Sequence, residues 1–228
     1  MSRDSGRWGF LIVEAVLIVA SILLAFAIDA WWDDQEREAQ RLELLSALEA
    51  DFYQTAEDLD SAIVEGERLV RRSGGYLEAV RRDLTVSRDS LVSLFDAVGG
   101  VAFFEPTLPS YRTALATGAI DLIRSPSLVR SLGEFDLAFG LYELHLGISA
   151  QLFYLGPNQD FRMIGGSFDG PRGERMGVSL VVPDSVDMRG PIAEATAEPT
   201  YTVQRNMLEN LHAMRAAASN VLAELASR

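Results

Sequence analysis

Cysteine is absent from this chain of 228 residues. Without a thiol the protein can form no disulfide, has no cysteine nucleophile and offers no thiolate ligand to a metal. Basic residues are also scarce, because 20 basic side chains stand against 33 acidic ones and the net charge is −13. A chain this acidic repels phosphate backbones, so we expect no nucleic-acid partner.

The motifs of common phosphate and ester chemistry are absent as well. The glycines of residues 165–177 are followed by no Gly-Lys-Ser/Thr, and the chain contains no G-x-G-x-x-G. Neither a phosphate-binding loop nor a dinucleotide-binding turn is therefore predicted. Ser167 lacks the glycine two residues later that a nucleophile elbow requires.

Histidine is rare, with only His145 and His212. Glu209 and His212 have the spacing of a ligand pair in di-iron carboxylate proteins, but that site needs a second such pair. Three residues before His145 the chain has Tyr142, which does not supply it. We interpret Glu209 and His212 as an ordinary surface pair, and we expect no metal site, no cofactor and no enzyme activity.

What the chain does have is a long apolar run near its N-terminus, "WGFLIVEAVLIVASILLAFAIDAWWDD". A helix from Trp8 to Trp31 would be about 35 Å long, slightly more than the ~30 Å hydrocarbon layer of a membrane. Tryptophan prefers the two membrane interfaces, so Trp8, Trp31 and Trp32 are predicted to be interfacial anchors. The run therefore predicts a transmembrane helix over residues 8–32.

A cleaved signal peptide is the alternative interpretation, because "AFA" at residues 25–27 resembles a cleavage site. The apolar run is longer than a usual signal core, and Glu14 interrupts it. Both features favour a retained anchor.

The charges beside the run predict its direction. Arg3 and Arg7 precede it, whereas "DDQERE" follows it with more acids than bases. Because basic residues favour the cytoplasmic side, residues 1–7 are expected in the cytoplasm and residues 33–228 outside it. In a Gram-negative bacterium this is an inner-membrane protein with a periplasmic domain.

Glu14 has two possible explanations. It could be protonated, or could reach water near the cytoplasmic headgroups. Alternatively, it belongs to a face of the helix that contacts another membrane protein, since Glu14, Ser21 and Ala25 fall on one side, with Asp29 beside them. The small residues Ser21 and Ala25 would let a second helix approach closely. These four residues are the candidate partner face.

The remainder of the chain predicts an all-α bundle with one long irregular insertion. Apolar spacing predicts a helix over 33–72 with a break at residues 73–75, a helical stretch from Tyr76, and a last helix over about 201–227. Between them we expect a short helix at 89–98, one from Ser110 to a stop at Gly118, and a long one from Ser125-Pro126 to Leu155. Residues 156–200 are rich in glycine and proline and are predicted to form an irregular loop, with one possible strand in "VSLVV".

Two blocks of the sequence resemble a family of uncharacterised single-span bacterial proteins. That family opens with a glutamate before "GILIAL-x-ID-x-W" and an acidic stretch, and the matching residues here are Glu14, Ile28, Asp29, Trp31 and Arg37. Its helical block "Y-x-x-L-x-x-x-G-x-L-x-L-I" is matched by Tyr111, Leu115, Gly118, Leu122 and Ile123. Ser21 replaces the usual glycine and Ile120 the first leucine after Gly118. The resemblance implies a membrane-anchored helical domain outside the cytoplasm, and it brings no catalytic residues.

Two functions are compatible with this sequence. The first is an accessory, non-catalytic subunit that packs its span and outer helices on a larger membrane complex, such as a respiratory or photosynthetic one. The second is a membrane-anchored periplasmic sensor or ligand-binding module. The partners expected are membrane lipid and other membrane protein subunits.

Overall fold

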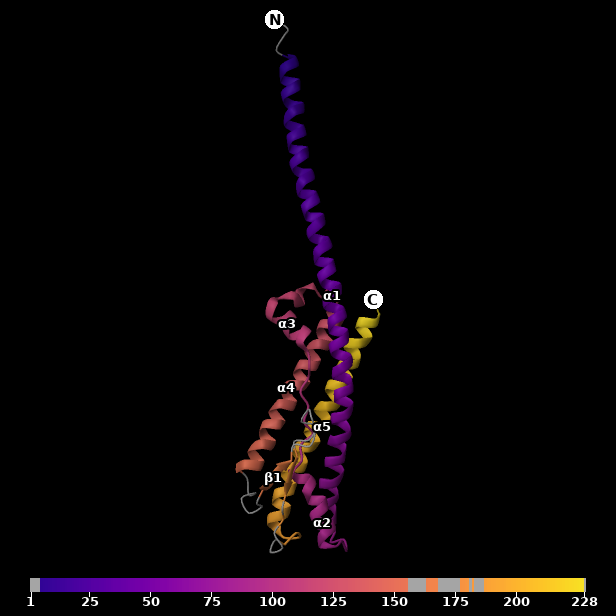
Figure 1. Ribbon diagram of the computed structural model, residues 1–228, viewed down its shortest axis with the longest axis vertical. Helices are drawn as coiled ribbons and strands as arrows, with labels where there is room; N and C mark the ends of the chain where they lie inside the picture. Colours follow the sequence, from indigo (N-terminus) through magenta and orange to yellow (C-terminus); the bar gives the residue numbers. More distant parts are fainter. Residues whose placement is uncertain (1–4, 156–162, 168–176, 181, 183–186, 228) are drawn as a thin grey trace.

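A computed structural model of the protein describes residues 5–155, 163–167, 177–180, 182 and 187–227. The described residues form helices apart from connecting segments and two short strands, so the predicted all-α class is confirmed. Figure 1 shows α1, α4 and α5 running along the long axis of the molecule, with the N-terminal part of α1 projecting alone from one end.

The longest element is α1, Ser5–Arg81, a single helix of 77 residues. At 1.5 Å per residue it extends over about 115 Å. From Val16 to Arg37 every described residue is exposed, and the first buried one is Leu45. Beyond it Leu48, Phe52 and Leu59 are fully buried, which confirms the predicted apolar seam.

The predicted break at residues 73–75 is wrong, because α1 passes through both glycines. A Cβ on Gly74 would lie 3.0 Å from the ring of Tyr201 on the last helix, and one on Gly66 would lie 3.1 Å from Leu208. These glycines therefore give α5 room to pack closely against α1. Packing overrides the weak helix propensity of glycine here.

A pair of substitutions tests this interpretation. Gly74→Ala is expected to lower the free energy of unfolding by about 1 kcal/mol, because steric strain exceeds the gain in helix propensity. Gly75→Ala is the control, since its Cβ would meet Leu94 at an ordinary 3.6 Å. It should raise stability by up to about 1 kcal/mol. Denaturant unfolding in detergent, followed by circular dichroism, measures both, and an equal effect of the two variants would contradict the packing argument.

The main hydrophobic core lies where α1, α4 (Pro126–Leu155) and α5 (Pro191–Ala226) meet. The rings of Phe52 on α1 and Phe135 on α4 pack edge to face with their centroids 5.3 Å apart. From α5 the row Met207, Leu211 and Met214 is almost completely buried. This row confirms the predicted rhythm of the last helix.

Short helices connect the long ones, and most of their predicted ends are confirmed. The stretch predicted at 89–98 is α2, Arg88–Phe95, followed by the 3₁₀ helix η1, Asp96–Gly99. Helix α3, Pro109–Thr117, ends at Gly118, whose φ of 76° suits glycine, and η2, Ala119–Leu122, follows. Ser125 precedes Pro126 as predicted, and its Oγ accepts a hydrogen bond from the backbone N–H of Leu128 at 3.3 Å.

One predicted cap is wrong. Helix α3 starts at Pro109 rather than after Ser110, and Leu108 occupies the N-cap position. The backbone N–H of Ser110 instead donates to the carboxylate of Asp51 on α1, at 2.8 Å. The start of α3 is thus fixed by a residue of another helix, which local sequence does not reveal.

A smaller hydrophobic cluster closes the end of the bundle farthest from the projecting helix. Tyr76 of α1 packs on Phe95 with ring centroids 5.0 Å apart, and its hydroxyl donates to the carbonyl of Met188. Arg189 donates to the carboxylate of Asp83 at 3.2 Å and to the carbonyl of Leu84 at 2.5 Å. The segment before α5 therefore caps the end of α1.

The predicted irregular region 156–200 is partly wrong. Strands β1, Met163–Ser167, and β2, Gly177–Leu180, pair antiparallel, and β2 overlaps the predicted "VSLVV" strand. Helix α5 already starts at Pro191, ten residues before the predicted start, and Ala193 and Ala197 on it are fully buried. Residues 156–162, 168–176, 181 and 183–186 lie outside the described part.

Candidate functional site

The first candidate site is the projecting part of α1. A stretch of 18 residues in this part of the helix has a mean hydropathy of 1.9, and none of these residues is buried in the fold. By length and composition it is the one helix in the described part of the chain that could cross a membrane. Large exposed side chains such as Leu17, Leu24 and Phe26 would be costly in water. This surface therefore favours a membrane anchor over a core helix.

The predicted interfacial tryptophans all lie on α1. Trp31 and Trp32 are 56% and 62% exposed, and their rings meet edge to face at 5.2 Å. They mark the point where the apolar run ends and the charged stretch begins. Trp8 lies on the same helix, and its side chain is outside the described part.

The candidate partner face is carried by one continuous helix and is open to its surroundings. Glu14, Ser21, Ala25 and Asp29 are all exposed. The hydroxyl of Ser21 donates to the carbonyl of Leu17 at 2.8 Å, so its hydrogen bond is satisfied within the helix. Ser21 then presents a small surface and leaves no unpaired donor on this face.

The helix enters the bundle through a charged junction. Arg41 donates to both carboxylate oxygens of Glu38, with a shortest contact of 2.6 Å, and Arg124 approaches the same carboxylate at 3.4 Å. The hydrogen bond from Arg41 holds the pKa of Glu38 below its ordinary value. Because Arg124 lies just before α4, the junction ties the emerging helix to the bundle.

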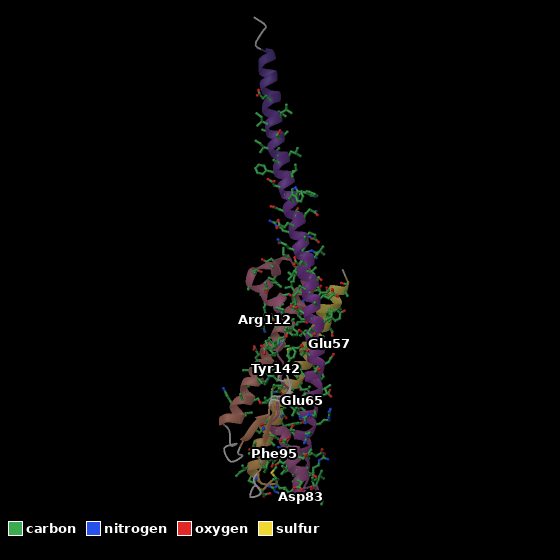
Figure 2. The ribbon with its side chains drawn as sticks, in the orientation of Figure 1. Glu57, Glu65, Asp83, Phe95, Arg112 and Tyr142 are labelled. Atoms are coloured by element: carbon green, nitrogen blue, oxygen red, sulfur yellow. The ribbon has the colours of Figure 1, made fainter. Side chains whose placement is uncertain are left out.

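Two clefts lie along α1. The first, of about 420 Å³, is formed by Gln40, Glu43 and Leu44 of α1 against α3 and η2. The second, of about 760 Å³, lies between α1 and the segment 103–109. Asp58, Glu65 and Arg112 border it, and Figure 2 labels the latter two. Volumes of this size are typical of small-molecule sites.

The two histidines of the chain lie apart from the candidate face of α1. Among the described residues, no group of three or more histidine, aspartate or glutamate side chains is placed to hold a metal ion. His145 of α4 contacts the amides of Asn210 at 2.9 Å and Asn206 at 3.5 Å. His212 is exposed, and Glu209 pairs with Arg205 at 3.7 Å.

The sequence interpretation missed an apolar surface on α4. Leu137, Leu141 and Leu144 are 67%, 43% and 58% exposed on the side facing away from the bundle. Three glycines lie among them, Gly133, Gly140 and Gly147, and a Cβ on any of these would meet nothing within 4 Å. Their regular seven-residue spacing was the signal in the sequence that could have revealed this surface.

Comparisons with protein-family models, with curated proteins and with solved structures gave no match to this chain. The resemblance described for its N-terminal and helical blocks therefore stays a prediction.

Proposed function

We propose that this protein is a non-catalytic, single-pass membrane subunit that packs on a larger membrane protein complex. Residues 8–32 would span the bacterial inner membrane with residues 1–7 in the cytoplasm, and residues 33–228 would form a periplasmic helical domain. The continuity of α1 from the exposed apolar run into the bundle is the observation that carries the proposal. A contact made in the membrane would then be coupled mechanically to the outer domain.

The physical argument rests on the polar and small residues of the run. A carboxylate in the hydrocarbon layer is costly unless it has a partner, and Glu14 makes no contact with the bundle. A host helix lying along Glu14, Ser21 and Ala25 would satisfy the carboxyl group and pack closely over the small side chains. A partner protein therefore accounts for the carboxyl group of Glu14 within the span better than contact with lipid alone does.

Glu14→Leu tests the proposal. We expect the variant to insert normally but to retain about tenfold less of the host complex after mild detergent solubilisation, as the loss of one interhelical polar contact implies. Mass spectrometry of the co-purified proteins measures the retention.

Val19→Leu is the matched control for this experiment, because Val19 lies on the opposite side of the same helix and is also exposed. It should leave co-purification unchanged. Equal retention of the complex by wild type and Glu14→Leu would refute the partner face.

A sensor or ligand-binding module is the second candidate function. The cleft of about 760 Å³ favours it, since both charged and apolar side chains border that cleft. Recovery of the native protein as a free monomer or dimer would favour this function, and stoichiometric recovery with a large complex would favour the subunit.

A further inference from the structure

The segment between η1 and α3 has the side-chain pattern of a β-strand. Over residues 102–108 the side chains are alternately buried and exposed, with Ala102, Phe104, Pro106 and Leu108 buried and the three residues between them exposed. A period of two is that of an extended chain. Neither described strand, β1 or β2, includes any part of this segment.

Two contacts with α1 show how far the segment is stretched. Ala102 lies beside Gly66, and the backbone N–H of Ser110 donates to Asp51. On α1 these contact points are 15 residues apart, which is about 22 Å along the helix. The eight steps from Ala102 to Ser110 therefore cover about 2.8 Å each, close to the ~3.3 Å of a strand.

One edge of the segment is held by α4. The hydroxyl of Tyr142 accepts a hydrogen bond from the N–H of Phe104 at 2.8 Å and donates to the carbonyl of Ala102 at 2.6 Å. These contacts fix the segment in its extended form before any partner arrives. A binding partner would therefore lose little free energy in ordering it.

The other edge of the segment is open. In an extended chain the backbone groups of alternate residues point to the same edge, so those of Phe103, Glu105 and Thr107 point away from Tyr142. Within the described part of the chain, the N–H and C=O groups of these three residues form no hydrogen bond. We call these three residues the open edge. All three line the cleft of about 760 Å³ beside α1.

We propose that this cleft binds an extended, basic segment of the host complex, which adds to the open edge as a second strand. Backbone hydrogen bonds to an unpaired edge supply affinity in this mode of recognition, and alternate side chains supply specificity. The choice of the host complex as the source of the segment rests on the proposed function. The strand pairing rests on the cleft and the open edge alone.

The charge of the cleft favours a basic peptide. Residues 42–67 of α1 include eight acidic side chains and no basic one, and Asp58 and Glu65 of this stretch line the cleft. Glu105 lies opposite them on the open edge, and it forms no ion pair with another described residue. Arg112 is the one basic residue that lines the cleft. Lysine or arginine side chains on the added strand would complement the three carboxylates.

The added strand is expected to alternate basic with small apolar residues. Its successive side chains point to opposite faces. One face would lie beside the exposed acids, and the other would meet the buried side chains of Ala62 and Leu108, which also line the cleft.

A synthetic peptide of alternating lysine and valine tests the pairing, because it has this charge and pattern. The labelled peptide is added to the full chain in non-ionic detergent, and its binding is measured by fluorescence anisotropy. One control is the fully N-methylated peptide, which keeps the charges but has no backbone donor. The other alternates glutamate and valine. We expect the lysine peptide to bind about tenfold more tightly than either control. Equal binding of a control, or no binding of the lysine peptide, would overturn the proposal.

Two substitutions test whether the peptide lies on the open edge. Thr107→Pro removes one backbone donor from that edge, and Glu105→Lys reverses its charge. Each should weaken binding of the lysine peptide about tenfold. Glu134→Lys is the matched control, since Glu134 is exposed on α4 and the net charge changes equally. Circular dichroism checks the fold, and Glu105→Lys decides the test if Thr107→Pro does not fold. An equal effect of Glu105→Lys and Glu134→Lys would refute the site.

Cross-linking in native membranes tests the source of the segment. A photoreactive amino acid replaces Thr107, and the adducts are identified by mass spectrometry. A cross-link to a protein that co-purifies with the wild-type chain would support the host complex. A cross-linked homodimer, or no adduct with a co-purifying protein, would overturn this source.

The inference and the proposed function fail in different ways. If the lysine peptide does not bind while Glu14→Leu still releases a host complex, the strand pairing is wrong and the proposed function stands. If the peptide binds to a protein that purifies without any host, the proposed function is wrong and so is the source of the segment.

Discussion

Replacing Gln204 by leucine is expected to lower the free energy of unfolding by about 3 kcal/mol. The amide group of Gln204 is buried on α5 and donates to the carbonyls of Ala97 and Gly100 at 2.8 and 2.9 Å. Its oxygen accepts a hydrogen bond from the hydroxyl of Ser73 on α1 at 2.7 Å. One side chain therefore joins three segments that are distant in the sequence.

The size of the effect follows from desolvation. Leucine has nearly the volume of glutamine, so the substitution leaves little cavity. It removes three hydrogen bonds, deprives the carbonyl of Gly100 of its donor and leaves the carbonyl of Ala97 with only the N–H of Gly100 at 3.1 Å. Each unsatisfied buried polar group costs about 1–3 kcal/mol. Denaturant unfolding of the full chain in detergent, followed by circular dichroism, measures the loss.

Gln54→Leu is the matched control for Gln204→Leu. Gln54 is exposed on α1, where it donates to Asp58 at 3.0 Å. The same chemical change should alter stability there by less than about 0.5 kcal/mol. If the two variants were equally stable, the hydrogen bonds of Gln204 would not be holding η1 between α1 and α5.

Raising the pH above about 10 is expected to destabilise the fold steeply. Tyr76, Tyr111 and Tyr142 are buried, and burial raises the pKa of each hydroxyl well above its ordinary value. For Tyr111 the hydrogen bond to Asp136 raises the pKa further. The unfolded chain would release these protons near pH 10, whereas the folded chain retains them.

The direction of the effect follows from this difference. Below about pH 10 both states hold the protons, so the stability is complete. As the pH rises further, each of the three tyrosines lowers the free energy of unfolding by about 1.4 kcal/mol per pH unit. The chain has no lysine and no cysteine, so neither side chain titrates in the same range. Alkaline unfolding should therefore report the buried tyrosines.

Tyr142→Phe measures the contribution of one of the three buried tyrosines to this loss of stability. The Tyr142 hydroxyl donates to the carbonyl of Ala102 and accepts from the N–H of Phe104 at 2.8 Å, so the variant should be less stable at neutral pH. Its stability should also fall less steeply above pH 10, by about 1.4 kcal/mol per pH unit. Tyr53→Phe, at an exposed position, should leave the slope unchanged. An identical slope in all three proteins would disprove the assignment.

Local sequence signals predicted the elements that depend on neighbouring residues. The seam of α1, the proline start of α4 and the stop at Gly118 were all predicted, because apolar periodicity and cap residues act within a few positions. The ion pair between Glu38 and Arg41 is of the same local kind, because residues three positions apart lie on one side of a helix.

The errors share a different cause. The glycines of residues 73–75 predict a helix break, but α1 continues through them and Tyr201 packs against Gly74. The glycines and prolines of residues 156–200 predict an irregular loop, yet residues 191–200 belong to α5 and bury Ala193 and Ala197. In each case a contact from another helix outweighed an unfavourable local propensity.

The sequence by itself determined the all-α class, the position of the long apolar run and the absence of thiol chemistry. These depend on composition and on the apolar pattern within single segments, which needs no contact with the rest of the chain. Only the tertiary structure decided which glycines give room to a neighbour, where α5 starts and which buried amide joins Ser73 to η1. It also decided that Leu137 and Leu144 of α4 face outward. Such features depend on residues distant in the chain that folding brings within a few ångströms of each other.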